Sequence, residues 1–286
     1  MSLKEAADVA AAAQLACLLE ASAPKPGNVS PGRHFADTRY EHFLASAAAI
    51  GGPLAGAGAR SVGSTVRLAI EATARWTRSN TNLGIVLLLA PVARAALADQ
   101  PAGGLRAAIG DVLAATTVDD ARDVYAAIRR AAPGGLGQAE AQDVADEPTL
   151  PLLDVMRLAA HRDGIAREYD STFAVTFEIG VPALDAARRA GLPWDEAVVE
   201  TFLTLLAASP DTHIARRAGE AAAAGVSRLA RATLEAGGVR SDLGRRALEE
   251  MDVELRKEGH SKNPGTTADL TTAAIFVMLL GGAWHG

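Results

Sequence analysis

Apolar residues recur along most of the chain with the three-to-four-residue spacing of an amphipathic helix. In residues 5–21, for example, Val9, Ala12, Ala16 and Leu19 fall on one side of the predicted helix. Polar segments rich in proline, glycine and small hydroxyl residues separate these stretches and predict loops between helices. The glycine-rich residues 51–58 predict a turn or flexible loop.

The same spacing predicts a helix over residues 163–179 and a later helix that ends at the glycines of residues 237–238. Ser209 followed by Pro210 is a strong start signal for that later helix, with Ser209 as its N-cap. The capping-box spacing of Thr117 and Asp120 predicts another helix start.

Residues 85–91 form an unbroken apolar run that fits either a buried strand or a buried helix. No other segment of similar strength is present in the sequence to pair with it as a strand, so we expect a core helix. The pattern therefore predicts an all-α protein, a bundle of about ten to twelve helices, with residues 1–286 forming a single catalytic domain.

Composition supports this fold class. Of the 286 residues, 49% are hydrophobic and 4% aromatic, and alanine, the best helix former, dominates. The net charge of −6 argues against nucleic acid as the main partner. Cys17 is the single cysteine, which excludes an intrachain disulfide and a cysteine-based zinc site. No apolar run is long enough for a membrane helix, so we expect a cytoplasmic protein, with a homodimer as one possible state.

Four polar loop-to-helix joints carry the candidate chemistry. The joints are residues 25–37, 79–84, 209–217 and 261–269. A helix start directs backbone N–H groups and the positive end of the helix dipole at one spot, which suits phosphate. In the last joint, Thr266 or Thr267 is a candidate N-cap and Asp269 a capping-box partner, so an ordinary helix start is an equally open interpretation.

Together the joints offer amides, hydroxyls, cations and carboxylates. Brought to one place, they would bind a polyanion through N–H groups and cations, while aspartates hold Mg²⁺ through oxygen ligands. Asp211 also has an alternative role, because a carboxylate in the first turn of a helix suits the helix dipole.

Several segments, in order, resemble the triphosphoribosyl-dephospho-CoA synthase family. They are residues 23–27, residues 80–84 running into 87–91, residues 166–169, Asp211-Thr212 with Arg217, and residues 264–270. The resemblance implies an all-helical enzyme that joins ATP to 3'-dephospho-CoA and releases adenine. The product in this family is the precursor of the prosthetic group of citrate lyase or malonate decarboxylase acyl carrier proteins.

The resemblance also implies roles for residues of this chain. The candidate catalytic residues are His34, Asp37 and Asp211, and the candidate Mg²⁺ ligands are Asp211 and Asp269. The candidate nucleotide-binding residues are Lys25, Gly27, Glu71, Asn80, Thr81, Asn82, Gly84, Arg167, Arg217, Lys262, Asn263, Gly265, Thr266 and Thr267.

The chain departs from the family pattern in the second joint. The family usually has Asn-Thr-His-Lys-Gly there, whereas this chain has Asn82 and Leu83 in place of the histidine and lysine. Three alternatives therefore stay open beside the family reaction. They are a related reaction in another cofactor pathway such as one-carbon cofactor biosynthesis, another Mg²⁺-dependent helical enzyme such as an ADP-ribose hydrolase, and a nucleotide-binding protein without catalysis.

Overall fold

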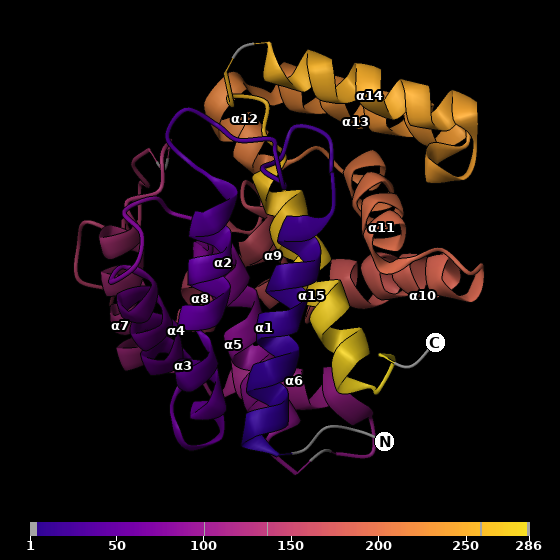
Figure 1. Cartoon of the computed structure of the whole chain (residues 1–286). Coiled ribbons are helices and arrows are strands. Elements are labelled where there is room, and N and C mark those ends of the chain that lie inside the picture. The colour runs from indigo at the N-terminus through magenta and orange to yellow at the C-terminus, as the bar shows by residue number, and fades with distance from the viewer. Residues whose placement is uncertain (1–4, 100, 136, 258, 285–286) are drawn as a thin grey trace.

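The computed structural model describes residues 5–99, 101–135, 137–257 and 259–284, and within these ranges the chain is helical with no β-strand (Figure 1). The predicted all-α class is confirmed, although the helices outnumber the ten to twelve expected. The α-helices are α1 (Ala6–Ser22), α2 (Tyr40–Ala49), α3 (Gly51–Ala55), α4 (Val62–Thr73), α5 (Leu83–Ala96), α6 (Gly104–Ala114), α7 (Val118–Ala131), α8 (Leu152–Ala159), α9 (Gly164–Asp170), α10 (Val181–Arg189), α11 (Trp194–Ala208), α12 (Thr212–Ala218), α13 (Glu220–Glu235), α14 (Asp242–Arg256) and α15 (Gly265–Leu280).

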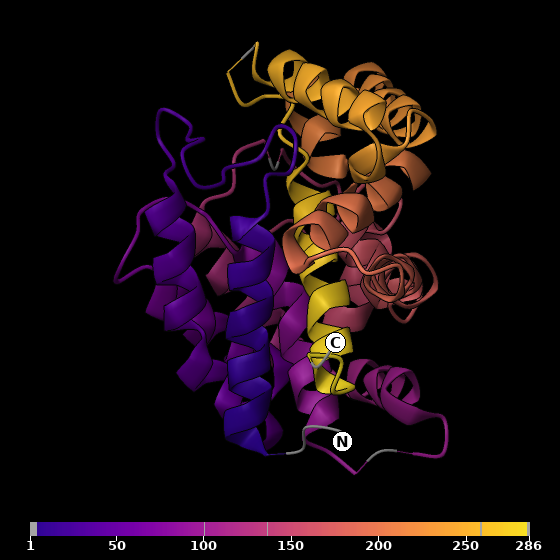
Figure 2. The ribbon, with the colours of Figure 1, turned by 45° about the vertical axis from the view of Figure 1, so that its right-hand side comes forward.

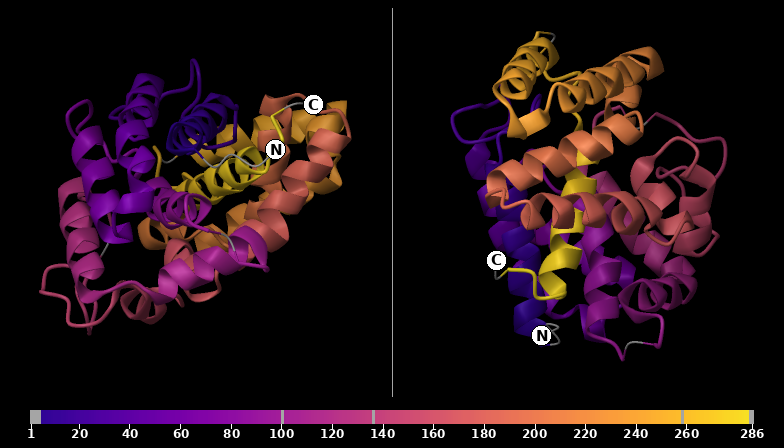
Figure 3. Two further views of the ribbon diagram at one scale, coloured as in Figure 1. Left: turned by 90° about the horizontal axis from the view of Figure 1, so that it is seen from below. Right: turned by 90° about the vertical axis from the view of Figure 1, so that its right-hand side faces the viewer.

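Helix α15 is the centre of the structure. It contacts α1 and α5 on one side and α10 and α11 on the other, and Figures 2 and 3 show it running between these two groups. Every residue of α15 except Gly265 and Asp269 is buried. A helix that is apolar on all faces must be surrounded by protein, which explains why this segment lies at the core. The pair α13 and α14 crosses the end of the bundle at which α15 begins.

Helix α5 is also buried on nearly all sides, which confirms the helix interpretation of residues 85–91. Pro91 lies inside it and has no N–H to donate to the carbonyl of Leu87, four residues earlier. The buried hydroxyl of Tyr169 donates to that carbonyl instead, at 2.7 Å. A side chain 82 positions away in sequence therefore supplies the hydrogen bond that the proline removes.

Two predicted segments have a different structure. Residues 51–58 were expected to form a loop, but they fold into α3 and a 3₁₀ turn, η1 (Ala57–Ala59). The single helix predicted over residues 163–179 is wrong: α9 ends at Asp170, and a π-helical turn, η2 (Thr176–Gly180), follows. The fully buried carboxylate of Glu168 causes the break, because it accepts bonds from the backbone N–H groups of Val175 and Thr176.

Helix starts were predicted less well than helices. The capping box of Thr117 and Asp120 is confirmed. The helix start predicted at Ser209 is wrong by two residues, since Asp211 is the N-cap of α12. The single helix predicted from there to residues 237–238 is two helices, because Gly219, with a φ of 91°, ends α12 and is the N-cap of α13. The capping box predicted at Thr266 is also wrong, because α15 begins at Gly265 with Pro264 as its N-cap.

One continuous cluster of buried apolar side chains runs from Val9 in α1 to Leu280 in α15. A single domain over residues 1–286 stays a prediction, and its first four and last two residues lie outside the described ranges. In the described part of the chain, no helix combines the length and hydropathy needed to cross a membrane.

We predict that Tyr169→Phe lowers the free energy of unfolding by about 1–3 kcal/mol, the cost of leaving a buried acceptor unsatisfied. The variant Pro91→Ala restores an N–H that can donate to Leu87 within α5. In that background the cost of Tyr169→Phe should therefore shrink. Urea denaturation of the four proteins of this double-mutant cycle measures the coupling. Equal costs in both backgrounds would contradict the role assigned to Tyr169.

Candidate functional site

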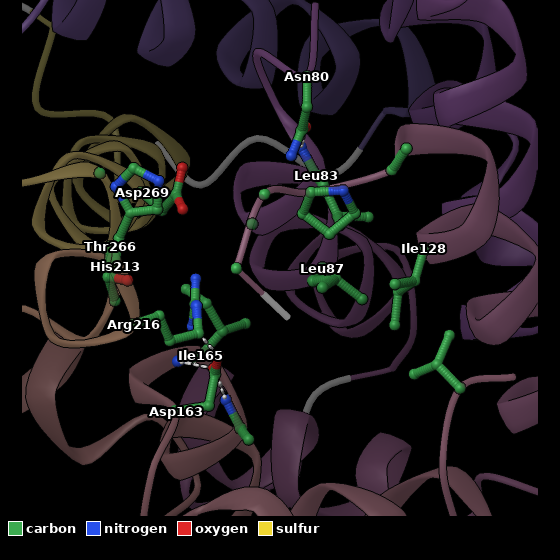
Figure 4. Close-up of a pocket in the computed structure, with 18 of the residues that line it drawn as sticks. Asn80, Leu83, Leu87, Ile128, Asp163, Ile165, His213, Arg216, Thr266 and Asp269 are labelled. Carbon is green, nitrogen blue, oxygen red and sulfur yellow. Dashed lines mark hydrogen bonds and ion pairs between the residues drawn. The ribbon is translucent and has the colours of Figure 1, made fainter. Parts of the chain in front are cut away.

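The start of α15 opens onto a cavity of about 1390 Å³, shown in Figure 4. Its walls come from residues 28–38, the start of α5, the end of α7 with the loop after it, and helices α8, α12 and α15. Each of the four polar joints contributes lining residues. Pockets for one small molecule measure roughly 300–1,000 Å³, so this cavity has room for more than one such molecule.

Gly84 and Asp269 come from different joints and meet in the cavity. A Cβ atom on residue 84 would overlap the Asp269 carboxylate, which explains why the start of α5 has a glycine here. Asp269 lies one turn into α15 and lines the cavity, whereas the residues around it in the helix are buried. The helix thus places one carboxyl group in the cavity, beside Thr266, and packs the side chains of its later turns into the core.

The electrostatics at Asp269 are unusual. Burial raises the pKa of its carboxyl group well above the usual range, and the nearby carboxylates of Glu20, Asp211 and Asp163 raise it further. The Arg216 guanidinium acts in the opposite direction. Among the residues that the structure describes, none forms a hydrogen bond or ion pair with Asp269. A positive charge from a ligand or a cation would therefore favour ionisation of this group.

Asp211 joins α12 to α15. Its Oδ1 atom accepts a hydrogen bond from the Ile214 N–H at 3.0 Å, which caps α12. Its Oδ2 atom accepts from both the N–H and the hydroxyl of Thr267, each at 2.7 Å. Asp211 is buried, and its two oxygens are already used by the protein. The alternative interpretation of the sequence placed Asp211 in the first turn of the helix that follows it, and the structure makes it the N-cap of that helix, α12. The contact with Thr267, which fixes the start of α15, was not predicted.

His213, Arg216 and Arg217 bring nitrogen groups of α12 to the cavity. The His213 Nδ1 atom lies 3.0 Å from the carbonyl oxygen of Asn263, and burial lowers the pKa of the ring. A Cβ on Gly265 would lie 2.8 Å from this Nδ1, so the glycine makes space for the ring. The Nη1 atom of Arg216 forms an ion pair with Asp163 at 2.6 Å, which orients the guanidinium at the cavity wall.

Ten of the predicted site residues line this cavity. They are Asp37, Asn80, Thr81, Asn82, Gly84, Arg217, Asn263, Gly265, Thr266 and Asp269. Asn82 nevertheless turns its side-chain amide into the protein, where it donates to the hydroxyl of Thr73 at 2.9 Å.

Eight predicted residues are not part of the cavity lining. They are Lys25, Gly27, His34, Glu71, Arg167, Asp211, Lys262 and Thr267. Lys25 is the largest departure from expectation, because it is 1% exposed and pairs with buried Glu20 at 3.0 Å. Glu71 lines a separate small cavity with Arg67, and exposed His34 accepts a hydrogen bond from the Tyr40 N–H. The glycine at residue 27 serves packing, since a Cβ there would overlap Leu255.

Sequence reasoning missed Asp163, His213 and Arg216, which Figure 4 shows together on one side of the cavity. A signal for two of them was present. His213 and Arg216 are three residues apart and therefore share a helix face, which is the face that Arg217 extends. The contribution of Asp163 had no such signal, because it depends on α9 lying beside α12.

We predict that Asp269→Asn stabilises the protein above pH 4 relative to the wild type. Because the folded-state pKa of Asp269 is raised, the native state holds a proton that the unfolded state has lost above about pH 4. The contribution of Asp269 to the free energy of unfolding of the wild type should therefore fall with rising pH. The amide variant has no ionisable group at this position and lacks that loss of stability. Urea denaturation from pH 4 to pH 8 measures the difference, and identical pH profiles would rule out a raised pKa.

Comparison with known proteins places this geometry in context. The family described as ATP:dephospho-CoA triphosphoribosyl transferase matches residues 6–286. A protein of Stutzerimonas stutzeri (strain A1501), named "Probable 2-(5''-triphosphoribosyl)-3'-dephosphocoenzyme-A synthase", is 35% identical over 114 residues, which are 40% of this chain and 39% of that protein. A protein of the same name from Pseudomonas paraeruginosa (strain DSM 24068 / PA7) is 36% identical over 110 residues, 37% of each chain. These alignments span about two fifths of the relatives' length.

A crystal structure gives a similarity over more of the chain. It is that of a protein from Archaeoglobus fulgidus provisionally named as a triphosphoribosyl-dephospho-coA synthase. The two structures superpose with a TM-score of 0.65 at 26% identity, covering 84% of this chain and 99% of the archaeal one. Because the family match extends through all four polar joints that line the cavity, this chain belongs to the ATP:dephospho-CoA triphosphoribosyl transferase family.

Proposed function

We propose that this protein transfers the triphosphoribosyl group of ATP to a ribose hydroxyl of 3'-dephospho-CoA and releases adenine. One observation carries the proposal: four polar joints spread from residue 25 to residue 269 resemble family motifs and line one cavity. The family match over residues 6–286 supports the same reaction. The cavity volume of about 1390 Å³ fits the need to hold two nucleotides at once.

The triphosphate would lie along the wall formed by α12 and the start of α15. Arg216 and Arg217 offer guanidinium groups to it, and the start of the 16-residue α15 offers the positive end of its helix dipole. Asn80 and Thr266 line the same space and can donate hydrogen bonds to phosphate oxygens. The phosphates pass through the reaction unchanged, so this wall needs only to bind and orient them.

The proposed reaction is a glycosyl transfer. The acceptor hydroxyl oxygen forms a bond to C1' of the ATP ribose while the bond from C1' to N9 of adenine breaks. The hydroxyl proton passes to a base, and adenine takes up a proton after leaving with the bonding electrons. Positive charge develops at C1', and a nearby carboxylate stabilises it. Asp269 is the candidate for that carboxylate, and Asp37, which lines the cavity rim, is a better-placed candidate base than His34.

We propose that Mg²⁺ binds together with ATP. In the described residues, no group of three His, Cys, Asp or Glu side chains is arranged to hold a metal ion alone. A magnesium ion commonly takes most of its ligands from phosphates and water and only one or two from protein carboxylates, and Asp269 fits this role. The ion would supply a positive charge that favours ionisation of Asp269. Asp211 would act by positioning the start of α15 rather than by binding the metal.

The same donor chemistry on a different acceptor is the second candidate function. Its support is the second joint, where Asn82 hydrogen-bonds to Thr73 and Leu83 presents an aliphatic side chain to the cavity. Neither side chain supplies the base and the cation usual in the family.

Because ATP and dephospho-CoA are cytoplasmic metabolites, we also propose a cytoplasmic location. We propose a homodimer as the oligomeric state.

We predict that the purified protein releases free adenine when ATP, Mg²⁺ and dephospho-CoA are all present, with no release when the acceptor is omitted. Asp269→Ala should lower the rate on the order of 100-fold, because it removes the carboxylate nearest the reacting centre. Mass spectrometry of adenine and of the coupled product measures both. Asp154→Ala, which removes an exposed carboxylate outside the cavity, is the control and should keep wild-type activity. Tight ATP binding without adenine release would leave a nucleotide site but exclude the proposed reaction.

We predict that Arg217→Met weakens ATP binding by roughly 10–100-fold, the value of one charge-assisted hydrogen bond. Adenosine, which has no phosphates, should bind the variant and the wild type equally. Isothermal titration with both ligands tests this, with Arg189→Met on the exposed face of α10 as the matched control. An equal loss for adenosine and ATP would show that Arg217 does not act on the phosphates.

A further inference from the structure

The cavity has a second wall of different character, opposite the polar one. Figure 4 shows Leu83, Leu87 and Ile128 facing the space from the side away from Asp269 and His213. Val155 and Met156 of α8 extend this aliphatic wall. Three helices, α5, α7 and α8, thus contribute to one apolar surface beside the proposed nucleotide site.

The charge around this wall disfavours phosphate. The residues that α7 and α8 place in the lining carry no charged side chain. The loop after α7 adds Glu140 and Asp143, and hydrogen bonds from the N–H groups of Ala139 and Ala145 lower the pKa of Asp143. Arg162, which lines the cavity just after α8, also lowers the pKa of Asp143, so the border of this wall carries two carboxylates and one guanidinium. The opposite wall carries the guanidinium groups of Arg216 and Arg217. An uncharged part of a ligand is the better occupant.

The shape of the side chains also distinguishes between uncharged ligands. Nucleobases bind well where aromatic rings stack on them. Among the lining residues of α5, α7 and α8, the aromatic residue is Tyr125, whose hydroxyl is bound to the Gln142 carbonyl, while Phe43 lines the cavity from α2. Phe35 and His260, which stack with ring centroids 4.9 Å apart, belong to the polar loops instead. Branched aliphatic side chains suit a flexible chain of methylene groups.

The aliphatic wall continues outward to the molecular surface. Leu158 also lines the cavity and is 48% exposed, so the apolar surface reaches the opening. A ligand with a long uncharged tail could therefore lie along the wall with its end near solvent. The acceptor in the proposed reaction has such a tail, because dephospho-CoA is ADP extended by a pantetheine arm of methylene and amide groups that ends in a thiol.

We propose that the wall formed by Leu83, Leu87, Ile128, Val155 and Met156 binds the pantetheine arm of the acceptor. This inference rests on the proposed function and assigns the acceptor to one side of the cavity and the triphosphate to the other. Leu83 then has a binding function of its own. Its aliphatic side chain contributes to the site for the pantetheine arm, at the position where the family usually has lysine.

Two substitutions on one helix test the proposal. Val155 and Leu153 are both half-buried residues of α8 that pack against the core, but only Val155 is in the cavity lining. Val155→Gln should weaken binding of dephospho-CoA about tenfold and leave binding of ADP, which lacks the arm, unchanged. Leu153→Gln should leave both affinities unchanged. Isothermal titration measures the affinity of each variant for dephospho-CoA and for ADP, each compared with the wild type. Circular dichroism checks that both variants stay folded.

The outcomes separate this inference from the proposed function. A wild-type protein that binds ADP as tightly as dephospho-CoA overturns the arm site, and so does an equal loss of both ligands in Val155→Gln. If adenine release persists in either case, the proposed reaction stands and the arm lies elsewhere. If wild-type protein releases no adenine yet prefers dephospho-CoA over ADP through Val155, the arm site stands and the reaction is wrong.

Discussion

Burial of α15 on every side is the constraint on which the rest of the structure depends. A helix without a solvent face needs neighbours all round, and α1, α5, α10 and α11 supply them. The buried hydroxyls of Thr271 and Thr272 donate to backbone carbonyls one turn earlier, and that of Thr267 donates to Asp211. The only partly exposed residues of the helix, Gly265 and Asp269, both line the cavity, together with buried Thr266. The same helix therefore fills the core with its buried side chains and brings Asp269 to the cavity.

Much of the fold could be predicted from the sequence, because helical periodicity and alanine content are local signals. The failures have tertiary causes. The break after α9 depends on the buried Glu168 carboxylate, which competes with continued helix for the N–H groups of Val175 and Thr176. The start of α15 was assigned a local capping box, but the Thr267 hydroxyl bonds to Asp211 from another joint. Neither contact follows the spacing of helical hydrogen bonds, because Glu168 lies seven residues before Val175 and Asp211 lies 56 residues before Thr267.

The site was predictable to a similar degree. Motif order brought the four joints together, and each does contribute to the cavity. Lys25 shows the limit of that reasoning, because a lysine beside glycine and proline suggests phosphate binding until its buried partner Glu20 is known. In the second joint, Asn82 holds the start of α5 to α4 through Thr73. The departure from the family motif there gives the cavity the aliphatic side chain of Leu83.

The position of α15 in the chain has a consequence for biosynthesis. Every helix that packs against α15 precedes it, so a ribosome exposes α1 to α14 before the segment that fills their centre. Until α15 emerges, apolar faces of α1, α5 and α11 have no permanent partner, which is the situation in which nascent chains aggregate or need chaperones. Completion of the core also delivers Asp269 to Gly84. Assembly of the cavity should therefore wait for the synthesis of α15.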